Sequence, residues 1–212
     1  MSRSNSSKAW LQEHVADPYV RRAKAQGYRS RAAFKLLEID AKDHLLKPGM
    51  IVVDLGAVPG GWSQVATRRV RALTDQAGPG CVVALDVLDL EPIAGVEFIK
   101  GDFCEAATLA KLDDALAARQ VDLVLSDLSP NISGIAISDQ ARSLNLAELA
   151  VEFASQRLRN GGALLVKVFQ GGGVEALRES MRTLFGSVVV RKPRASRGRS
   201  AELYLLGRGR KA

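Results

Sequence analysis

The chain has 212 residues, of which 47% are hydrophobic, and a formal net charge of +7. This composition predicts one globular domain that folds without a disulfide or metal framework, and Cys81 and Cys104 lie too far apart to suggest otherwise. Because the first eight residues are polar and no apolar run reaches 18 residues, the sequence predicts neither a signal peptide nor a membrane-spanning helix, and we expect a soluble cytoplasmic protein.

Short apolar runs alternate with segments of helical periodicity, which is the βαβ pattern of a sheet covered by helices on both faces. Helices are predicted near residues 30–44, 61–72, 104–119, 139–159 and 173–184. Strands are predicted at Met50–Asp54, Cys81–Asp86, Val96–Ile99, Val121–Asp127, Ala163–Phe169, Ser187–Arg191 and Glu202–Gly207. Since ligands of open α/β sheets bind outside the carboxyl ends of the strands, the residues that end these strands are site candidates.

The first predicted strand ends in Asp54 and continues into a glycine-rich turn, residues 56–62, that leads into a helix. Such a turn lets backbone N–H groups approach a ligand. Its spacing matches neither the dinucleotide-binding pattern nor the phosphate loop that ends in Gly-Lys-Ser/Thr. It fits S-adenosylmethionine, whose ammonium needs a carboxylate and whose carboxylate needs N–H donors. A tight turn without a ligand is the alternative.

Further acids lie at the ends of the next strands. Asp86 can accept hydrogen bonds from both hydroxyls of a ribose, and Asp102 from an adenine amino group, because buried polar groups of a ligand need partners. A helix cap is the alternative role for either acid. Asp127 ends the fourth strand.

Lys167 interrupts the apolar strand Ala163–Phe169. Burial disfavours a charged amine unless an acid compensates, so a lysine at this position can become a base near neutral pH. Asp127 is expected at the same edge of the sheet, where the two side chains can meet. The alternative is that the ammonium simply reaches solvent at the end of the strand.

Basic residues gather toward both ends of the chain: residues 1–49 carry +5, residues 186–212 carry +7, and residues 50–185 carry −5. This distribution predicts a phosphate-rich partner, although a solvated basic surface gives the same count. The candidate phosphate contacts are Arg21, Arg22, Lys24, Arg29, Arg31, Arg191, Lys192, Arg194, Arg197 and Arg199. Only 5% of the residues are aromatic, which favours a folded RNA over a long stacked single strand.

Four residues, Lys35, Asp127, Lys167 and Glu202, resemble the Lys-Asp-Lys-Glu tetrad of RNA ribose 2′-O-methyltransferases. The whole chain resembles the FtsJ (RlmE) family. The motifs that carry the resemblance are residues 30–36, the glycine-rich turn, and residues 126–134, 166–171 and 191–204. Departures are small: Val58 stands where the family often has Ala, and Leu128-Ser129 stands where Met-Ala is common.

The resemblance implies an α/β, Rossmann-like class I S-adenosylmethionine-dependent methyltransferase. Its sheet would have seven strands, mostly parallel with one antiparallel strand, and helices on both faces. We expect a single domain over residues 1–212, with a basic extension at 1–28 and a catalytic core at 29–212. By resemblance, Lys35, Asp127, Lys167 and Glu202 are catalytic, and Lys167 is the proton acceptor. The implied cofactor contacts are Gly60, Trp62, Asp86, Asp102 and Asp127.

The implied reaction is methyl transfer from S-adenosylmethionine to the ribose 2′-hydroxyl of a uridine in 23S ribosomal RNA, on the assembled 50S subunit. We expect a monomer that needs no metal and no membrane. One alternative is another RNA substrate, such as transfer RNA or a cap. Others are a non-catalytic ribosome-assembly factor, which would have no use for Lys167 beside Asp127, and a nicotinamide-dependent oxidoreductase, whose glycine spacing is absent.

Overall fold

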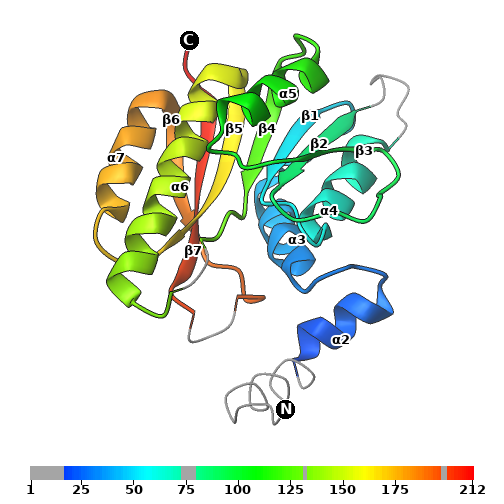
Figure 1. Cartoon of the computed structure of the whole chain (residues 1–212), viewed down its shortest axis with the longest axis horizontal. Coiled ribbons are helices and arrows are strands. Elements are labelled where there is room, and N and C mark those ends of the chain that lie inside the picture. Colours follow the sequence, from blue (N-terminus) through cyan, green and yellow to red (C-terminus); the bar gives the residue numbers. More distant parts are fainter. Residues whose placement is uncertain (1–16, 73–79, 131–132, 197–199) are drawn as a thin grey trace.

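Figure 1 shows the computed structural model, which describes residues 17–72, 80–130, 133–196 and 200–212. Its centre is a seven-stranded sheet of order β3-β2-β1-β4-β5-β7-β6. The strands are β1 (Ile51–Leu55), β2 (Cys81–Asp86), β3 (Val96–Lys100), β4 (Val121–Ser126), β5 (Leu158–Phe169), β6 (Phe185–Arg191) and β7 (Glu202–Arg210). The first five strands are parallel, and β7 runs antiparallel to both β5 and β6. The predicted Rossmann-like architecture is therefore confirmed.

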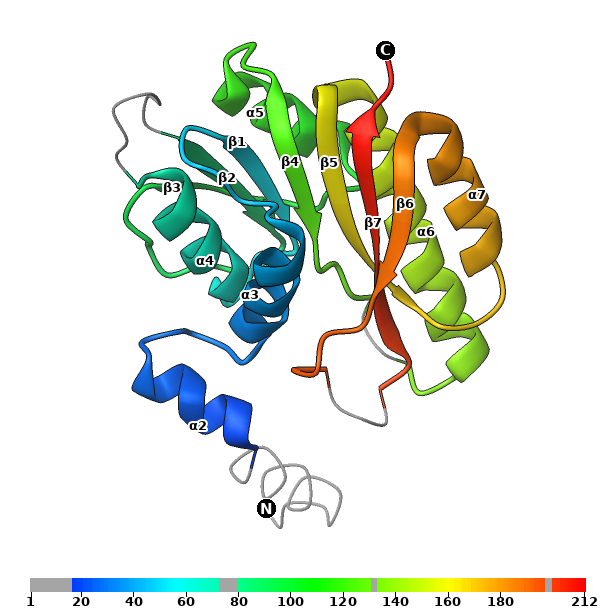
Figure 2. The same cartoon turned by 180° about the vertical axis from the view of Figure 1, so that it is seen from behind.

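Helices cover both faces of the sheet. They are α2 (Pro18–Ala25), α3 (Ala32–Asp43), α4 (Gly61–Val70), α5 (Ala106–Leu116), α6 (Ala136–Arg157) and α7 (Val174–Leu184). Figure 1 looks onto the face that carries α5, α6 and α7, and Figure 2 onto the opposite face with α3 and α4. Each face has its own apolar core, which explains why the central strands are apolar on both sides. No helix of the described chain is long and apolar enough to span a membrane.

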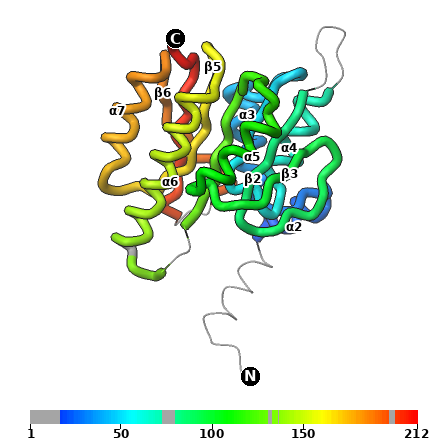
Figure 3. The backbone as a smooth tube through the Cα atoms, turned by 45° about the horizontal axis from the view of Figure 1, so that its top comes forward, coloured from blue at the N-terminus to red at the C-terminus, as the bar shows by residue number. Residues whose placement is uncertain are grey.

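The last strand enters the sheet between strands that precede it in the sequence. The tube in Figure 3 ends with the red C-terminal segment beside β5 and β6. Because β7 is antiparallel, its first residue, Glu202, pairs with Phe169, the last residue of β5. Two residues further in, Tyr204 pairs with Lys167. The start of β7 therefore lies at the same sheet edge as the carboxyl ends of the parallel strands.

Several boundaries differ from the predicted ones. Helix α5 ends at Leu116 rather than at residue 119, because Ala117 and Ala118 adopt left-handed backbone angles with φ of 48° and 61°. Strand β5 begins at Leu158, where the chain passes from α6 directly into extended backbone. Strand β4 ends at Ser126, so Asp127 is the first residue of the following loop rather than part of the strand.

Helix α2 is absent from the prediction. Its start is nevertheless encoded, because the Asp17 carboxylate caps the Tyr19 amide at 2.9 Å and Pro18 occupies the first turn. Arg31 holds the helix start by pairing with Asp17. Ala23 of α2 is buried in a small apolar cluster beside the N-terminal part of α3. The basic residues of α2 thus have a fixed place next to α3.

An ion pair fastens α3 to the far edge of the sheet. Arg191 on β6 binds the Asp43 carboxylate with two hydrogen bonds of 2.6 and 2.7 Å, and the Asp43 side chain is only 5% exposed. The Arg191 hydrogen bonds, together with nearby positive charge, outweigh burial and lower the pKa of Asp43. The pair therefore stabilises the fold above about pH 4, and this contribution is lost as the pH falls through the lowered pKa.

Replacing Arg191 by alanine should lower the free energy of unfolding by about 3 kcal/mol at pH 7, because it leaves a buried carboxylate without its main partner. Urea denaturation measures the change. Arg182→Ala is the matched control, since among the described residues that arginine pairs only with exposed glutamates of α7, and its loss should cost less than about 1 kcal/mol. Equal losses for the two variants would contradict the assignment.

Candidate active site

The Lys167 ammonium is buried and is held by two hydrogen bonds and an ion pair. Its Nζ donates to the main-chain oxygen of Asp127 at 2.7 Å and to the Ser129 hydroxyl at 2.7 Å, and lies 3.1 Å from the Asp127 carboxylate. The side chain is only 5% exposed. The expected meeting of Lys167 with Asp127 is therefore present, and the alternative of an ammonium that reaches solvent does not apply.

Lys35 and Glu202 form a second buried pair beside the first. The Lys35 Nζ lies 2.7 and 2.8 Å from the two carboxylate oxygens of Glu202, and both side chains are less than 15% exposed. Ser196 also donates to Glu202, at 2.9 Å. Helix α3 supplies the lysine and the start of β7 supplies the glutamate, so residues 167 positions apart in the sequence meet at the sheet edge.

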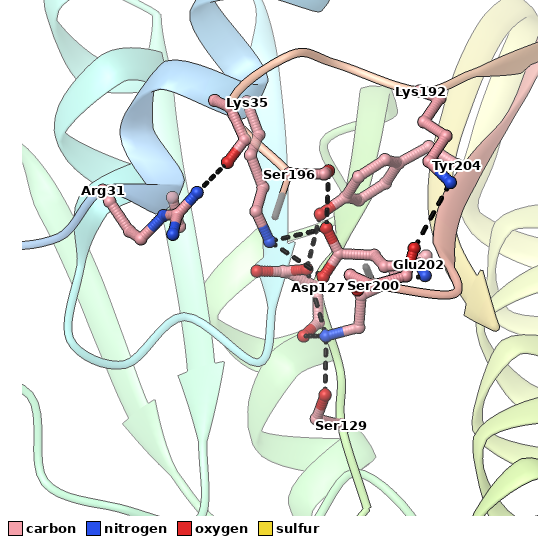
Figure 4. A network of polar contacts seen from close by, with 12 residues as sticks. Arg31, Lys35, Asp127, Ser129, Lys192, Ser196, Ser200, Glu202 and Tyr204 are labelled. Atoms are coloured by element: carbon pink, nitrogen blue, oxygen red, sulfur yellow. Dashed lines mark hydrogen bonds and ion pairs between the residues drawn. The ribbon is translucent and has the colours of Figure 1, made fainter. Parts of the chain in front are cut away.

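Tyr204 links the two pairs. Its hydroxyl donates to the Asp127 carboxylate at 3.0 Å, and its ring lies under the Lys35 ammonium. Burial, with the nearby Asp127 and Glu202 carboxylates, raises the pKa of Tyr204 well above its usual range. The phenol therefore stays protonated and donates. Figure 4 shows the network, in which Asp127, Glu202 and Tyr204 lie together between α3 and β7.

A cavity of about 890 Å³ opens at the carboxyl ends of β1, β2 and β4. Three of its lining residues are acids, Asp86, Asp102 and Asp127, and the rest of its wall is largely apolar. Asp86 binds the backbone amides of Val58 and Leu88, each at 2.9 Å, which fixes the carboxylate at the cavity wall. The cavity combines negative charge with apolar surface, as suits a cationic ligand that has an apolar or aromatic part.

Asp102 lines the cavity and also accepts a hydrogen bond within the loop after β3, but it is not a helix cap. One carboxylate oxygen accepts from the Cys104 amide at 2.9 Å, which makes a local turn ahead of α5. The α5 N-cap itself is Glu105 rather than Asp102. Because Asp102 also lines the cavity, its carboxylate can accept a further hydrogen bond there.

Two glycines of the glycine-rich turn lie in close contact with neighbouring segments of the chain. Gly56 has a φ of 76°, and a Cβ at this position would lie 3.0 Å from the backbone of Leu128. At Gly60, with a φ of 106°, a Cβ would lie 2.7 Å from the side chain of Ile93. A glycine at each of these positions lets neighbouring loops pass close to the start of α4.

Gly60 and Trp62 are not among the residues that line the cavity. The Trp62 indole donates to the Ala32 carbonyl at 2.8 Å, packs 5.5 Å from the Tyr204 ring, and is buried in the core beneath α3. The Trp62 side chain therefore supports the tetrad indirectly, by packing against Tyr204 and α3 in the core. Of the five expected cofactor contacts, the structure brings Asp86, Asp102 and Asp127 to the cavity.

A smaller pocket of about 150 Å³ lies on the α3 side of the tetrad. Its lining includes Arg31, Lys35, Ser200 and Glu202. Asp127 and Ser129, in contrast, line the larger cavity. The two pockets are therefore lined by different members of the tetrad. A ligand group in one pocket could approach a ligand group in the other across the tetrad.

Asp54 is fully buried at the end of β1. Ser63 of α4 donates to one of its carboxylate oxygens at 2.5 Å, and the other oxygen has no hydrogen-bond partner in the described chain. Burial raises the pKa of Asp54 to about 7, and the negative charges of Asp127 and Asp86 add to that effect against the Ser63 hydrogen bond. The carboxyl therefore titrates near neutral pH.

Sequence reasoning missed several members of the site. Tyr204 lies two residues after Glu202, so strand alternation puts both side chains on one face and could have indicated it. Ser129 and Ser196 had no such signal, because a single hydroxyl leaves no periodic pattern. The cavity wall contributed by α6 was also missed; its residues are Ala141, Arg142, Asn145 and Leu146.

Among the described residues, no group of three or more His, Cys, Asp or Glu side chains is placed to hold a metal ion. Cys81 and Cys104 are both free. Among the candidate phosphate contacts, Arg197 and Arg199 lie outside the described residues.

The sheet order, the strand-end cavity and the carboxylates on its wall define a class I methyltransferase fold. The FtsJ-like methyltransferase family model matches residues 28–210. This covers most of the chain, and the protein belongs to that family.

Curated relatives match along all or nearly all of their length. The ribosomal RNA large subunit methyltransferase E of Nitrosospira multiformis is 57% identical over 211 residues, which cover 100% of both chains. The protein of the same name from Azoarcus sp. is 57% identical over 207 residues, 98% of each chain.

Solved structures agree on the fold. A crystal structure from Plasmodium falciparum, described as a ribosomal RNA methyltransferase, is 30% identical, with a TM-score of 0.75 over 86% of this chain and 98% of that chain. A Streptococcus mutans protein described as a methyltransferase, crystallised with SAH, is 15% identical, with a TM-score of 0.50 over 82% of this chain and 95% of that one. The latter similarity concerns the fold alone.

The titration of Asp54 predicts a specific dependence of stability on pH. Between about pH 4 and pH 7 the folded chain holds a proton here that the unfolded chain has released. The stability from this group is full below about pH 4 and is lost as the pH rises to 7, about 4 kcal/mol for three pKa units. Asp54→Asn removes this loss, so its melting temperature should rise relative to wild type as the pH increases from 4 to 8.

Differential scanning calorimetry at several pH values tests this expectation. Asp89→Asn serves as the control, because the Asp89 side chain is 82% exposed and the substitution should leave a constant offset from wild type. A constant offset for Asp54→Asn as well would show that Asp54 does not titrate in this range.

Proposed function

We propose that the protein transfers a methyl group from S-adenosylmethionine to the ribose 2′-hydroxyl of a uridine in 23S ribosomal RNA, acting in the cytoplasm on the assembled large subunit. The observation that carries the proposal is the buried Lys167–Asp127 pair joined by Tyr204 to the Lys35–Glu202 pair at the rim of an acidic cavity. The names of the full-length relatives support ribosomal RNA as the substrate.

The 890 Å³ cavity suits S-adenosylmethionine in charge and shape. Asp86 and Asp102 offer acceptors for ribose hydroxyls and an adenine amino group, and Asp127 offers negative charge close to Lys167. Asp54 does not line this cavity, but its buried carboxyl lies close to the wall residue Gly56 in sequence and has one oxygen without a partner in the described chain. When bound, this ligand would supply an electrophilic methyl group. The wall residues would bind and orient it.

The tetrad residues have distinct tasks in this proposal. Lys35 and Glu202, which line the smaller pocket, would hold the target ribose. Lys167 would take the proton of the 2′-hydroxyl as the oxygen attacks the methyl group, and Asp127 with Tyr204 would keep the amine aimed at that oxygen. Holding the reacting atoms in line supplies several kcal/mol of the barrier reduction.

RNA would approach over a basic surface around the smaller pocket. Arg21, Arg22 and Lys24 are exposed on α2, and Lys192 and Arg194 are exposed on the loop after β6. Both segments border α3, which carries Lys35. These cations would bind phosphate and set the position of the RNA, without reading a base sequence.

Lys167→Ala should abolish methyl transfer while leaving S-adenosylmethionine binding nearly intact, because Lys167 does not line the cavity among its described residues. The assay is tritium transfer from labelled S-adenosylmethionine to purified large subunits from a strain without the endogenous enzyme, with the label mapped on the RNA. Calorimetric titration measures cofactor affinity separately.

Lys111→Ala is the matched control, since Lys111 is exposed on α5, away from the tetrad. Label on one uridine ribose that is lost only in Lys167→Ala would establish the reaction. Methyl transfer to transfer RNA or capped RNA instead of subunits would keep the proposed chemistry but show that the substrate is a different RNA. No transfer to any RNA would favour a ribosome-assembly factor.

The basic surface predicts a change in salt dependence. Reversing two exposed cations, in Lys24→Glu/Lys192→Glu, should weaken binding to 23S RNA and reduce the slope of log K against log salt by about two, because each phosphate contact contributes about one. Filter binding between 50 and 200 mM salt measures the slope. Lys111→Glu should leave it unchanged, and an unchanged slope in the double variant would exclude these contacts.

A further inference from the structure

Three acceptors surround the Lys167 ammonium, and they differ in how easily they can leave. The Asp127 backbone is anchored by its amide, which donates to the Leu55 carbonyl at 3.1 Å. Its carboxylate is held by Tyr204. Ser129 is exposed, and its hydroxyl makes no other hydrogen bond to the described residues. Of the three, the Ser129 hydroxyl is the partner that can move aside.

The chemistry of the three acceptors also differs. Two of the three N–H donors of the protonated lysine bind the Asp127 main-chain oxygen and the Ser129 hydroxyl, and the Asp127 carboxylate lies 3.1 Å from Nζ as an ion-pair partner. With three protein oxygens this close to Nζ, the oxygen of a substrate has to take the place of one of them. A carbonyl and a carboxylate only accept hydrogen bonds, whereas a hydroxyl both donates and accepts. Once Lys167 has lost a proton, its Nζ has a lone pair that can accept a hydrogen bond, and of these three groups only the hydroxyl can donate one. The Ser129 hydroxyl therefore matches the 2′-hydroxyl of a ribose in what it offers to Lys167.

We propose that Ser129 is a positioning residue for Lys167: the Ser129 hydroxyl occupies one hydrogen-bonding position of Nζ between turnovers and yields it to the ribose 2′-hydroxyl. This inference rests on the proposed function. In the step that follows, the ribose O–H bond breaks and its proton goes to Nζ. The new O–CH₃ bond forms as the S–CH₃ bond breaks, and that electron pair stays on sulfur. Ser129 neither gains nor loses a bond.

The other charged and titratable groups around Lys167 come from three elements. Asp127 follows β4, Tyr204 and Glu202 lie on β7, and Lys35 comes from α3. Lys35 is paired with Glu202, so Asp127 and Ser129 hold the Lys167 ammonium. A hydrogen bond to a charged donor is stronger than one to a neutral amine, so the Ser129 hydroxyl favours the protonated lysine.

The test compares kcat/KM for methyl transfer from pH 5 to pH 9 among wild type, Ser129→Ala and Ser129→Thr, because this constant reports the free enzyme, in which Ser129 still binds Lys167. In Ser129→Ala the acidic limb of the profile should move to lower pH by about 0.5 to 1 unit, the loss of one hydrogen bond to a charged group. The ratio of the alanine variant's rate to that of wild type then rises as the pH falls. Ser129→Thr keeps the hydroxyl at an exposed position and should retain the wild-type limb.

A rate ratio that is the same at every pH would overturn the proposal, because that result describes general damage to the site. A second measurement needs neither substrate nor cofactor: nitrogen-15 NMR of the Lys167 ammonium in the ligand-free protein. Its protons should exchange with water several-fold faster in Ser129→Ala than in wild type or Ser129→Thr. Unchanged exchange would also overturn the proposal. If the wild-type protein methylated no RNA, the proposed function would be wrong, and so would the replacement of the Ser129 hydroxyl by a ribose hydroxyl. The NMR comparison would still show whether Ser129 binds the Lys167 ammonium.

Discussion

The buried ammonium of Lys167 is the constraint around which this sheet edge is built. An unpaired charge inside an otherwise apolar strand costs several kcal/mol, so its acceptors have to be present whenever the chain is folded. They come from the loop after β4, whose Asp127 is in turn held by Tyr204 of β7. The antiparallel insertion of β7 next to β5 places Tyr204 opposite Lys167 and starts the strand with Glu202 at the same edge. The antiparallel strand thus supplies both Glu202 of the tetrad and Tyr204, which links its two pairs.

Helix α3 completes the tetrad from outside the βαβ pattern, and it is fixed in two ways. Asp43 at its end binds Arg191 on β6. Near its middle, the Glu38 carboxylate accepts from the Arg194 amide at 2.6 Å, in the loop that leads toward β7. Lys35 lies about one helical turn before Glu38 on the same helix and reaches Glu202. The contacts that hold the helix therefore also help to fix the distance between the two pairs, so one structural ion pair and one structural hydrogen bond contribute to the geometry of the site.

The sequence was sufficient for the strands and for one pair of site residues. Apolar runs that end in acids predict a parallel sheet with Asp86 and Asp127 at its carboxyl edge, and a lysine in an apolar strand predicts a buried partner. Lys35 and Glu202 were different, because alone they are an ordinary helix lysine and an alternating strand residue, and only the family resemblance singled them out. Strand alternation could place Tyr204 beside Glu202, but the contacts of Tyr204 and Ser129 could not be assigned, since they depend on which hydroxyl meets which charge after folding. The end of α5 was misjudged because its left-handed residues are alanines, which carry no turn signal.

The charge balance of the tetrad explains why such a cluster can be buried beside an acidic cavity. With both lysines protonated, Lys35, Asp127, Lys167 and Glu202 sum to zero, so the resting cluster has no net charge to solvate. When Lys167 is neutral the cluster carries −1, which is stable only if a positive charge lies nearby. A cationic ligand in the adjoining cavity, against Asp127, would provide that charge. In the proposed mechanism, a cationic ligand in the cavity would offset this negative charge, so electrostatics alone would couple proton uptake by Lys167 to occupancy of the cavity.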